Sequence, residues 1–411
     1  MENQLEALIV GSSSDILWGL PNLLSRAGFA VDVISTARVL RSSKFIRTAY
    51  DPEPESVEAM MRLAHRVISV RSRPYDWIIP GEDATLKALS ELEWPPGKKA
   101  GFPSGVVDDK PSHIYSKIGL SQVLSNAGIQ TPPFCVVSTC GDALVAAREI
   151  GYPVLLKVDV SFGGLGVREC RDDADILRQT DLFNGQSLLL QKRISGQQIC
   201  LDGTFIRHTL VHFSYSLPLR SAEHFGPSIV RRYYPLPLLE EKVFDEMRML
   251  GETLGADGFA NIACIDAEDG SGRYYFEADL RPNVWVNYSR YFGEDPAERI
   301  RKGFSSRAPL TKEGAGSPAG CSPVTIPYFL RLRCWELLVN RYQVWKFVPF
   351  VDTRVVLRLL IAKAYWRFYV VTCALLPGGL KTAIKRPLAT VCARFSRRGS
   401  SVNASRSMIA K

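Results

Sequence analysis

The segment Tyr-Tyr-Phe-Glu-Ala-Asp-Leu-Arg-Pro-Asn at residues 274–283 constrains this chain most, because it has the pattern of a buried strand that ends in charge. Side chains of an extended strand alternate between faces, so Glu277 and Asp279 share one face, while Tyr274, Phe276 and Ala278 fill the buried face. Two neighbouring carboxylates repel each other unless a cation lies between them. With Arg281 nearby, these hard oxygen ligands indicate Mg²⁺ and a phosphate; the alternative is a solvated acidic edge strand.

A second strand, at residues 258–266, precedes this segment. The turn Asp-Gly-Ser-Gly at residues 269–272 predicts that the two strands form an antiparallel hairpin. In that hairpin we expect Asp266 to lie opposite Glu277. Three carboxylates, Asp266, Glu277 and Asp279, would then meet around one position, which favours a metal site over a solvated face.

A glycine-rich loop follows another apolar strand. The segment Tyr-Pro-Val-Leu-Leu-Lys at residues 152–157 predicts a buried strand that delivers Lys157, and residues 163–166 read Gly-Gly-Leu-Gly. Backbone N–H groups of such a loop can lie against phosphate, and the nearby lysine favours that reading over a plain glycine hairpin. It is not a Walker loop, because no Gly-Lys-Ser/Thr follows and no helix begins there.

The N-terminal part predicts an α/β domain. Apolar strands at residues 5–10 and 30–34 flank a helical period, which is a βαβ pattern. Gly11 and the serines after it indicate a tight turn rather than a dinucleotide site. Nine cysteines without a CxxC pair, and an N-terminus without a secretion signal, predict reduced thiols and a cytoplasmic location.

The basic charge is concentrated at the C-terminal end. The segment from Ile326 onward contains sixteen lysines and arginines and only two acidic residues, Glu336 and Asp352, so its net charge is +14. The rest of the chain has 35 basic and 40 acidic residues and a net charge of −5. The apolar stretch at residues 355–376 carries three basic residues, which membrane-spanning helices rarely do. The readings left open are a helical cap on the core, peripheral contact with an anionic membrane surface on its inner face, an acidic partner and, last, nucleic acid.

The order of these motifs resembles the ATP-grasp superfamily, in its carboxylate–amine ligase branch, over residues 5–304. The matching pieces are Asp109-Lys110, the helix ending at Gly128, the strand before Lys157 and the glycine loop. The implied fold is α/β (α+β), an ATP-grasp fold with an N-terminal Rossmann-like pre-ATP-grasp domain and a C-terminal helical basic extension. The expected parts are residues 1–108 (pre-ATP-grasp domain), 109–192 (opening helix and nucleotide lid), 193–304 (catalytic core), 305–323 (linker), 324–395 (basic aromatic helical extension) and 396–411 (disordered tail).

The resemblance also implies roles for individual residues. The expected set is Lys110 and Lys157 on the ATP phosphates, Gly163, Gly164 and Gly166 closing over them, Gln191 and Lys192 at the adenine, Gln198 at the ribose, Asp266, Glu277 and Asp279 as metal ligands, and Arg281 and Asn283 at the transferred phosphoryl group. Four positions depart from the family's usual residues. Val158 replaces a common proline, Gln191 and Gln198 replace acidic residues, and Asp279 replaces asparagine.

The activity implied by the resemblance is an ADP-forming ligase. A substrate carboxylate attacks the γ-phosphate of ATP with Mg²⁺ (or Mn²⁺) as cofactor, and an amine then displaces phosphate from the acylphosphate to form an amide. Amino-acid-like substrates are expected, with Ser228, Arg231 and Arg232 as candidates for gripping a carboxylate or, equally, as a basic strand face. The alternative function is a catalytically degenerate ATP-binding module that the basic tail targets to a membrane surface or an acidic partner.

Overall fold

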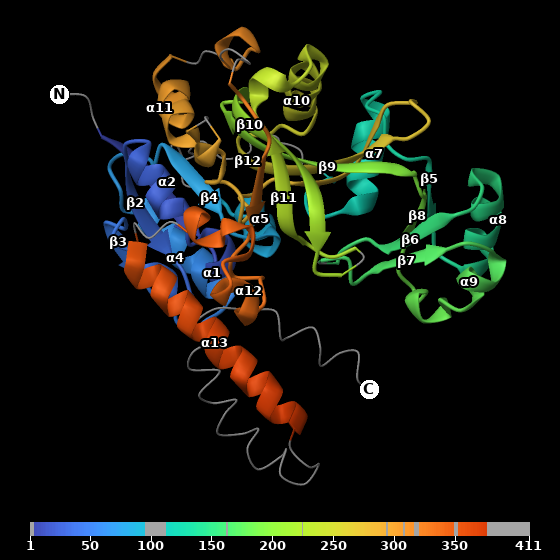
Figure 1. The fold of residues 1–411 in the computed structure, drawn as a ribbon, viewed down its shortest axis with the longest axis horizontal. Helices are drawn as coiled ribbons and strands as arrows, with labels where there is room; N and C mark the ends of the chain where they lie inside the picture. The colour runs from blue at the N-terminus through green and yellow to red at the C-terminus, as the bar shows by residue number, and fades with distance from the viewer. Residues whose placement is uncertain are drawn as a thin grey trace. The chain divides into compact units, whose positions relative to one another are not determined.

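The computed structural model of this chain describes residues 4–94, 112–161, 163–223, 225–292, 295–306, 309–315, 320–348 and 352–375. Its backbone divides into two compact units, which are described one at a time below (Figure 1). The first unit combines Met1–Phe102, Arg281–Ser306 and Pro327–Lys411, and the second combines Pro103–Leu280 and Arg307–Ile326. The candidate site residue Lys110 and the expected tail at residues 396–411 lie outside the described residues.

A four-stranded parallel sheet forms the centre of the first unit, in the order β3-β2-β1-β4. Its strands are β1 (Leu5–Val10), β2 (Phe29–Ile34), β3 (Thr48–Tyr50) and β4 (Trp77–Pro80). The helices between and after them are α1 (Ser14–Leu17), α2 (Leu20–Arg26), α3 (Arg38–Arg41), α4 (Val57–Ser69) and α5 (Asp83–Ser90). All residues of β2 and β4 are buried, as expected of a parallel sheet that is covered on both faces.

The serine-rich turn after β1 is bonded to a side chain of the protein itself. The Glu82 carboxylate accepts hydrogen bonds of 2.8 to 3.1 Å from the backbone N–H groups of Ser12 and Ser13. It also accepts from the hydroxyl groups of Ser12 and Thr85. Because a carboxylate occupies these N–H groups, the interpretation of this segment as a structural turn is confirmed.

The first unit also contains the C-terminal helices of the chain, and the beginning of the last helix packs against the rest of this unit. They comprise η3 (Ser289–Tyr291), α11 (Pro296–Ser306), α12 (Cys334–Leu338), η5 (Arg341–Phe347) and α13 (Thr353–Leu375). Val355, Val356 and Leu359 of α13 are buried, the Lys363 ammonium donates 2.7 Å to the Phe329 carbonyl, and the buried Asp352 carboxylate accepts from the Ser43 hydroxyl. The start of α13 therefore caps this unit. Within the described residues, no helix combines the length and apolar character that a membrane crossing requires.

The second unit begins with a four-stranded sheet in the order β5-β8-β6-β7. Its elements are α7 (Lys117–Asn126), β5 (Phe134–Val137), α8 (Cys140–Ile150), β6 (Val154–Val158), β7 (Val167–Cys170), α9 (Asp173–Leu177), η1 (Thr180–Leu182) and β8 (Leu188–Lys192). Helix α8 begins with a capping box of Thr139 and Asp142 and ends at Gly151, whose φ of 84° favours glycine. β6 and β7 pair antiparallel on either side of the glycine loop, so the predicted glycine hairpin is confirmed.

A six-stranded sheet, in the order β13-β12-β9-β10-β11-β14, forms the rest of the second unit. Its elements are β9 (Gly196–Ile206), β10 (Thr209–Ser221), β11 (Ser228–Tyr234), η2 (Leu236–Leu238), α10 (Glu241–Thr253), β12 (Gly258–Ala267), β13 (Arg273–Asp279), η4 (Glu313–Ala315) and β14 (Val324–Pro327). β12 and β13 form the predicted antiparallel hairpin. Helix α10 covers one face of this sheet, where Phe244 meets Phe213 edge to face at 5.1 Å between ring centroids. The opposite face is left for polar side chains.

The tight packing of α10 on the sheet gives a test of the fold. A Cβ atom on Gly251 would lie 2.2 Å from the buried Phe205 ring, whereas one on the exposed Gly141 of α8 would meet nothing closer than 3.7 Å. We expect Gly251→Ala to lower the free energy of unfolding by about 1–3 kcal/mol through overpacking. The matched variant Gly141→Ala should leave it unchanged or raise it by about 0.5 kcal/mol. Denaturant unfolding measures both; equal effects of the two variants would contradict this packing.

Candidate active site

A buried lysine lies at the centre of the smaller sheet of the second unit. Lys157 in β6 is 6% exposed, and its ammonium donates a 2.6 Å hydrogen bond to Gln191 Oε1 in β8. β6 and β8 place Leu155 opposite Gln191, so Lys157 and Gln191 lie on the same face of the sheet. Among the described residues, Gln191 is the one hydrogen-bond acceptor of this ammonium. Two of the three N–H groups of the Lys157 ammonium are therefore available to a ligand.

Burial changes the acidity of this lysine. Desolvation lowers the pKa of Lys157 to about 8, the charge of Lys117 lowers it further, and the charge of Glu277 raises it. The amide nitrogen of Gln191 is also buried and has no hydrogen-bond partner among the described residues. An unmet buried donor costs about 1–3 kcal/mol, so both groups would gain from an acceptor-rich ligand.

A second lysine, at the start of α7, holds the loop that follows β6. Lys117 Nζ donates to the carbonyl oxygens of Asp159 at 3.1 Å and Ser161 at 3.2 Å. The Asp159 carboxylate in turn accepts from the Ser116 hydroxyl and from the Ile118 N–H, both at 2.9 Å. The first turn of α7 therefore fixes the course of the chain between Lys157 and the glycines.

Lys117 is a further candidate site residue, which the sequence patterns did not single out. The sequence motif favoured Lys110, which lies outside the described residues. The overlooked signal was Ser116, which is a good N-cap residue directly before the helical period and whose side chain accepts from the Gly119 N–H. That cap starts the helix at Lys117 and turns this lysine toward the loop.

The glycines of the loop occupy places that other residues could not take. Gly163 and Gly164 have φ angles of 56° and 79°. A Cβ on Gly164 would lie 2.3 Å from the Phe225 carbonyl oxygen, and one on Gly166 would lie 2.5 Å from the Ser161 hydroxyl. The loop thus rests on the connection between β10 and β11. Its contact with phosphate stays a prediction.

The side of the six-stranded sheet opposite α10 carries a row of polar side chains, called here the polar face. The aligned residues are Asp279 on β13, Asn261 on β12, Asp202 on β9 and Ser214 on β10. The Asn261 amide donates to Asp279 Oδ2 at 3.3 Å, and the Ser214 hydroxyl donates to Asp202 Oδ2 at 3.3 Å. The sequence analysis missed Asn261 and Asp202 because their alignment depends on pairing between distant strands.

Glu277 belongs to the same face. It lies two residues before Asp279 in β13 and opposite Ala263, which pairs in turn with Cys200. Burial raises the pKa of the Cys200 thiol to about 11, the Arg231 guanidinium lowers it, and the charges of Asp202 and Glu277 raise it further. These carboxylates are therefore close enough to act on one thiol. As predicted, Glu277 and Asp279 share a face.

Asp266 does not join these carboxylates, and the prediction that it lies opposite Glu277 is wrong. Asp266 pairs with Arg273, whereas Glu277 pairs with Ala263, three residues or about 10 Å further along β12. Asp266 is also five residues from Asn261, an odd number, so strand alternation points it to the opposite face. In the described part of the chain, no group of three His, Cys, Asp or Glu side chains is arranged to hold a metal ion.

The turn register, with Asp266 opposite Arg273, sets the distance between Asp266 and Glu277, and a bulge in the hairpin puts the two side chains on opposite faces. The register shifts by one residue between Ala263 and Cys264, which leaves Phe276 as the extra residue on β13. The buried aromatic side chain is therefore Tyr275, 3% exposed, and not Tyr274 as expected. The Tyr275 hydroxyl donates 2.7 Å to Glu246 on α10. Phe276 instead places its ring centroid 5.3 Å from the Lys157 ammonium.

Arg281 and Asn283 belong to the first unit. The Arg281 guanidinium donates two hydrogen bonds, of 2.7 and 2.9 Å, to the Asp83 carboxylate. Asn283 is 8% exposed, and its side-chain oxygen accepts 2.8 Å from the Trp285 N–H. Their contact with a transferred phosphoryl group stays a prediction.

The remaining candidates lie on the strands of the second unit. Lys192 Nζ donates to the carbonyl oxygens of Gly151 and Tyr152 and so holds the start of β6. Gln198 in β9 is half-buried and, by alternation, on the polar face.

Arg231 does not stand ready to grip a substrate carboxylate. It is 5% exposed, its guanidinium lies 3.0 Å from the Asp202 carboxylate, and it donates 2.7 Å to the Ser228 hydroxyl. Its neighbour Arg232 is exposed and points to the other face of the sheet. The protein's own aspartate therefore already neutralises Arg231.

Comparison with known proteins agrees with this geometry. Residues 117–196 match a family model described as "Carbamoyl-phosphate synthase L chain, ATP binding domain". This match begins at Lys117 and includes Lys157, the glycine loop and Gln191. The resemblance to the ATP-grasp superfamily is confirmed.

The individual relatives cover this chain in part. The carbamoyl phosphate synthase large chain of Agathobacter rectalis is 27% identical over 226 residues, 51% of this chain and 20% of that one. The chain thus spans about a fifth of the length of that curated relative. Two solved structures share the fold. The biotin carboxylase domain of the 2-oxoglutarate carboxylase of Hydrogenobacter thermophilus, in complex with MgADP and bicarbonate, has a TM-score of 0.57 and 19% identity, covering 75% of this chain and 71% of that one. The L-amino acid ligase of Bacillus licheniformis has a TM-score of 0.53 and 16% identity, covering 79% of each chain.

The residues present fit a nucleotide and a divalent cation. Lys157 offers two N–H donors and Gln191 one unpartnered amide donor, which suits a ligand rich in oxygen and nitrogen acceptors. Glu277 and Asp279, with the amide of Asn261 beside them, supply the oxygen ligands that Mg²⁺ prefers. Asp266 is not part of that set.

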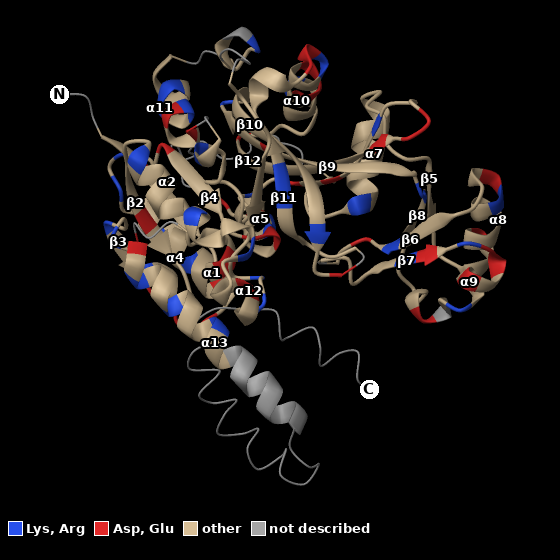
Figure 2. Cartoon of the chain, viewed as in Figure 1, with Lys and Arg blue, Asp and Glu red and all other residues tan. Residues whose placement is uncertain are grey.

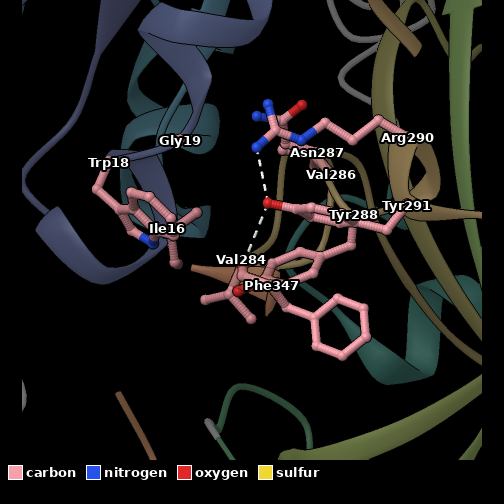
Figure 3. Close-up of a pocket in the computed structure, with 10 residues that line it drawn as sticks. All are labelled: Ile16, Trp18, Gly19, Val284, Val286, Asn287, Tyr288, Arg290, Tyr291 and Phe347. Atoms are coloured by element: carbon pink, nitrogen blue, oxygen red, sulfur yellow. Dashed lines mark hydrogen bonds between the residues drawn. The ribbon is translucent and has the colours of Figure 1, made fainter. Parts of the chain in front are cut away.

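A separate small pocket lies within the first unit (Figure 3). Its walls are formed by Ile16, Trp18, Gly19, Val284, Val286, Asn287, Tyr288, Arg290, Tyr291 and Phe347. Figure 3 shows the hydrogen bond that Arg290 donates to the Tyr291 hydroxyl and the one that this hydroxyl donates to the Phe347 carbonyl. Since the polar groups of the walls bond to each other and no carboxylate or lysine lines the pocket, we interpret it as a packing gap.

The lowered pKa of Lys157 predicts how stability depends on pH. The folded protein gives up the lysine proton near pH 8 and the unfolded chain near pH 10.5, so burying the charge costs stability below pH 8 and this cost disappears as the pH rises. Relative to Lys157→Met, the wild type should gain about 3 kcal/mol of unfolding free energy between pH 7 and pH 10.5. Urea unfolding at both pH values measures this gain. A difference between the two proteins that does not vary with pH would contradict a buried, charged Lys157.

Proposed function

We propose that this protein is an ADP-forming ligase that joins a carboxylate to an amine through an acylphosphate. The observation that carries the proposal is the buried Lys157 ammonium, with two N–H groups available, in the same unit as a glycine loop and a pair of neighbouring carboxylates. Such a cation together with a glycine loop suits phosphate, and paired carboxylates suit the metal that accompanies it. The ATP-binding family model over residues 117–196 supports the same reading.

The chain's own side chains would divide the work as follows. Lys157 and Lys117 bind phosphate oxygens, and the backbone of Gly163, Gly164 and Gly166 lies over them. Gln191 and Lys192 bind the adenine and Gln198 the ribose. Glu277 and Asp279 hold Mg²⁺, or Mn²⁺ in its place, and Asn261 orients Asp279 through its amide. The metal neutralises negative charge on the phosphates when bound.

The reaction balances in two steps. An oxygen of the substrate carboxylate attacks the γ-phosphorus, the bond to the β,γ-bridging oxygen breaks, and ADP leaves. The amine nitrogen then attacks the carbonyl carbon of the acylphosphate, inorganic phosphate leaves, and the nitrogen loses a proton. Arg281 and Asn283 are proposed to contact the phosphoryl group during transfer.

The proposed substrates are a carboxylate and an amine of amino-acid size. The name of the L-amino acid ligase with the same fold supports this class. Because Arg231 is bonded to Asp202, we do not assign it to the substrate carboxylate. A screen of amino acids and small carboxylates for stimulated ADP release identifies the pair. ATP binding without such stimulation would instead indicate a non-catalytic ATP-binding module.

Single substitutions test whether Lys157 and Glu277 belong to the site and whether Asp266 lies outside it. Lys157→Ala and Glu277→Ala should each lower substrate-stimulated ADP release about 10²–10³-fold, because each removes charge stabilisation at the phosphates. Asp266→Asn should retain wild-type activity, because Asp266 lies on the other face of the hairpin. A coupled assay of ADP release measures all three variants, with circular dichroism as a check of folding. Loss of activity in Asp266→Asn alone would overturn this assignment.

Asp279 should set the metal requirement. Replacing it with asparagine removes one negative charge from the pair with Glu277, so Asp279→Asn should raise the Mg²⁺ concentration needed for half-maximal activity about 10-fold. The matched control is Asp269→Asn in the exposed β12–β13 turn, which should leave the requirement unchanged. A titration of activity with Mg²⁺ at saturating ATP gives both values. An unchanged requirement in Asp279→Asn would remove Asp279 from the metal site.

The location and partners of the chain are part of the proposal. We propose a cytoplasmic ligase that acts on small molecules. A peripheral contact with a membrane or an acidic partner through residues 326–395 is also part of this proposal.

A further inference from the structure

Four apolar side chains are exposed together on α12 and η5 of the first unit, which we call the α12–η5 surface. Trp335 is 48% exposed, Leu338 84%, Val339 63% and Trp345 36%. The Trp345 indole N–H donates 3.0 Å to the Leu337 carbonyl, which ties η5 to α12. Leu338 and Val339 thus lie at the end of a short helix with a tryptophan from each element beside them.

Buried side chains and hydrogen bonds of the same segment hold the α12–η5 surface in a defined conformation. Leu337, Val344 and Phe347 are buried, and the Phe347 ring packs against Tyr291 edge to face at 5.4 Å between centroids. Glu336, 1% exposed, accepts from the Arg333 N–H at 2.8 Å and from the Arg341 guanidinium at 3.2 Å. Buried apolar anchors and the bond of the buried Glu336 to the exposed Arg341 therefore present the four apolar side chains outward.

The segment that carries the surface, residues 328–365, exposes only positive charges in its described part. The exposed ionised side chains there are Arg333, Arg341, Lys346, Arg354 and Arg358. The two acids of the segment, Glu336 and Asp352, are both buried and hydrogen-bonded. Figure 2 shows blue positions along the described part of α13. The partner of this surface must therefore combine negative charge with an apolar layer.

Charge argues against two possible partners of the α12–η5 surface: the C-terminal segment of the same chain and a second copy of the protein. Residues 376–411 contain eight lysines and arginines and no acidic residue, so this segment would be repelled by the cations of the surface. A second copy would bring the same positive surface and would also be repelled. An acidic protein would satisfy the cations but does not by itself account for four exposed apolar side chains.

We propose that the α12–η5 surface docks on an anionic lipid bilayer. Leu338, Val339 and the two tryptophans would enter the boundary between headgroups and acyl chains, where Trp is favoured. The arginines and Lys346 would bind the lipid phosphates. The contact is peripheral, in keeping with the absence of a membrane-crossing helix among the described residues. It is independent of the proposed ligase activity.

Sedimentation with vesicles tests the proposal on the full chain. The wild type should bind phosphatidylglycerol–phosphatidylcholine vesicles, bind pure phosphatidylcholine vesicles at least about 10-fold more weakly, and lose binding in high salt. The double variant Leu338→Ser, Val339→Ser keeps every charge and should bind the anionic vesicles about 10-fold more weakly. The control Val145→Ser, in exposed helix α8 of the other unit, should bind like the wild type.

A second measurement covers the case in which the double variant does not fold. Brominated lipids should quench the tryptophan fluorescence of the wild type on anionic vesicles, and Trp345→Phe should reduce this quenching. No binding of the wild type to anionic vesicles at low salt would overturn the proposal. Equal binding by the double variant and the wild type would overturn it as well, since binding would then depend on charge alone, as for an acidic protein partner.

Discussion

The hydrogen bond between the Lys157 ammonium and Gln191 is the constraint on which the candidate site depends. A charged lysine that is 6% exposed is unfavourable unless its surroundings compensate, and here the compensation is incomplete. One amide oxygen and the charge of Glu277 favour the ammonium, while burial and Lys117 oppose it. A triphosphate would complete the hydrogen bonds and neutralise both lysines. Such a ligand would therefore regain part of the free energy that the burial of these donors costs.

The six-stranded sheet separates stability from chemistry by the alternation of its strands. Along β9, Gly203 and Phe205 face α10 and form close apolar packing, while Cys200 and Asp202 face the opposite way. The same holds across the hairpin, where Tyr275 bonds to α10 and Glu277 points to the polar face. Because each strand contributes to both faces, a shift of register by one residue would exchange core and site. The Arg231–Asp202 pair, buried in the polar face, links β9 to β11 and opposes such a shift.

Local patterns predicted the elements, and long-range pairing decided the site. Both hairpins follow from turn residues that are close in sequence, so the glycine loop and the β12–β13 hairpin could be predicted. The partner of Glu277 could not, because it depends on the register at the turn, where Asp266 pairs with Arg273, and on a single bulge at Phe276 that carries no clear sequence signal. Lys117 was missed for a similar reason. Its role depends on Asp159, which lies beyond the whole of α7 and β6, and only the cap residue Ser116 pointed to it locally.

In the basic C-terminal segment, the fold decides which charged and apolar side chains are available to a partner. The sequence alone gives a net charge of +14 over residues 326–411, which is compatible with several kinds of partner, and does not say whether the two acids of this segment are exposed. The fold removes both acids from the surface, since Glu336 bonds Arg341 and Asp352 bonds Ser43. It also uses Val355, Val356 and Leu359 to dock α13. The apolar residues left outside, Leu338 above all, are therefore those that no internal contact requires, and a surface that is both cationic and apolar favours lipid over a purely charged partner.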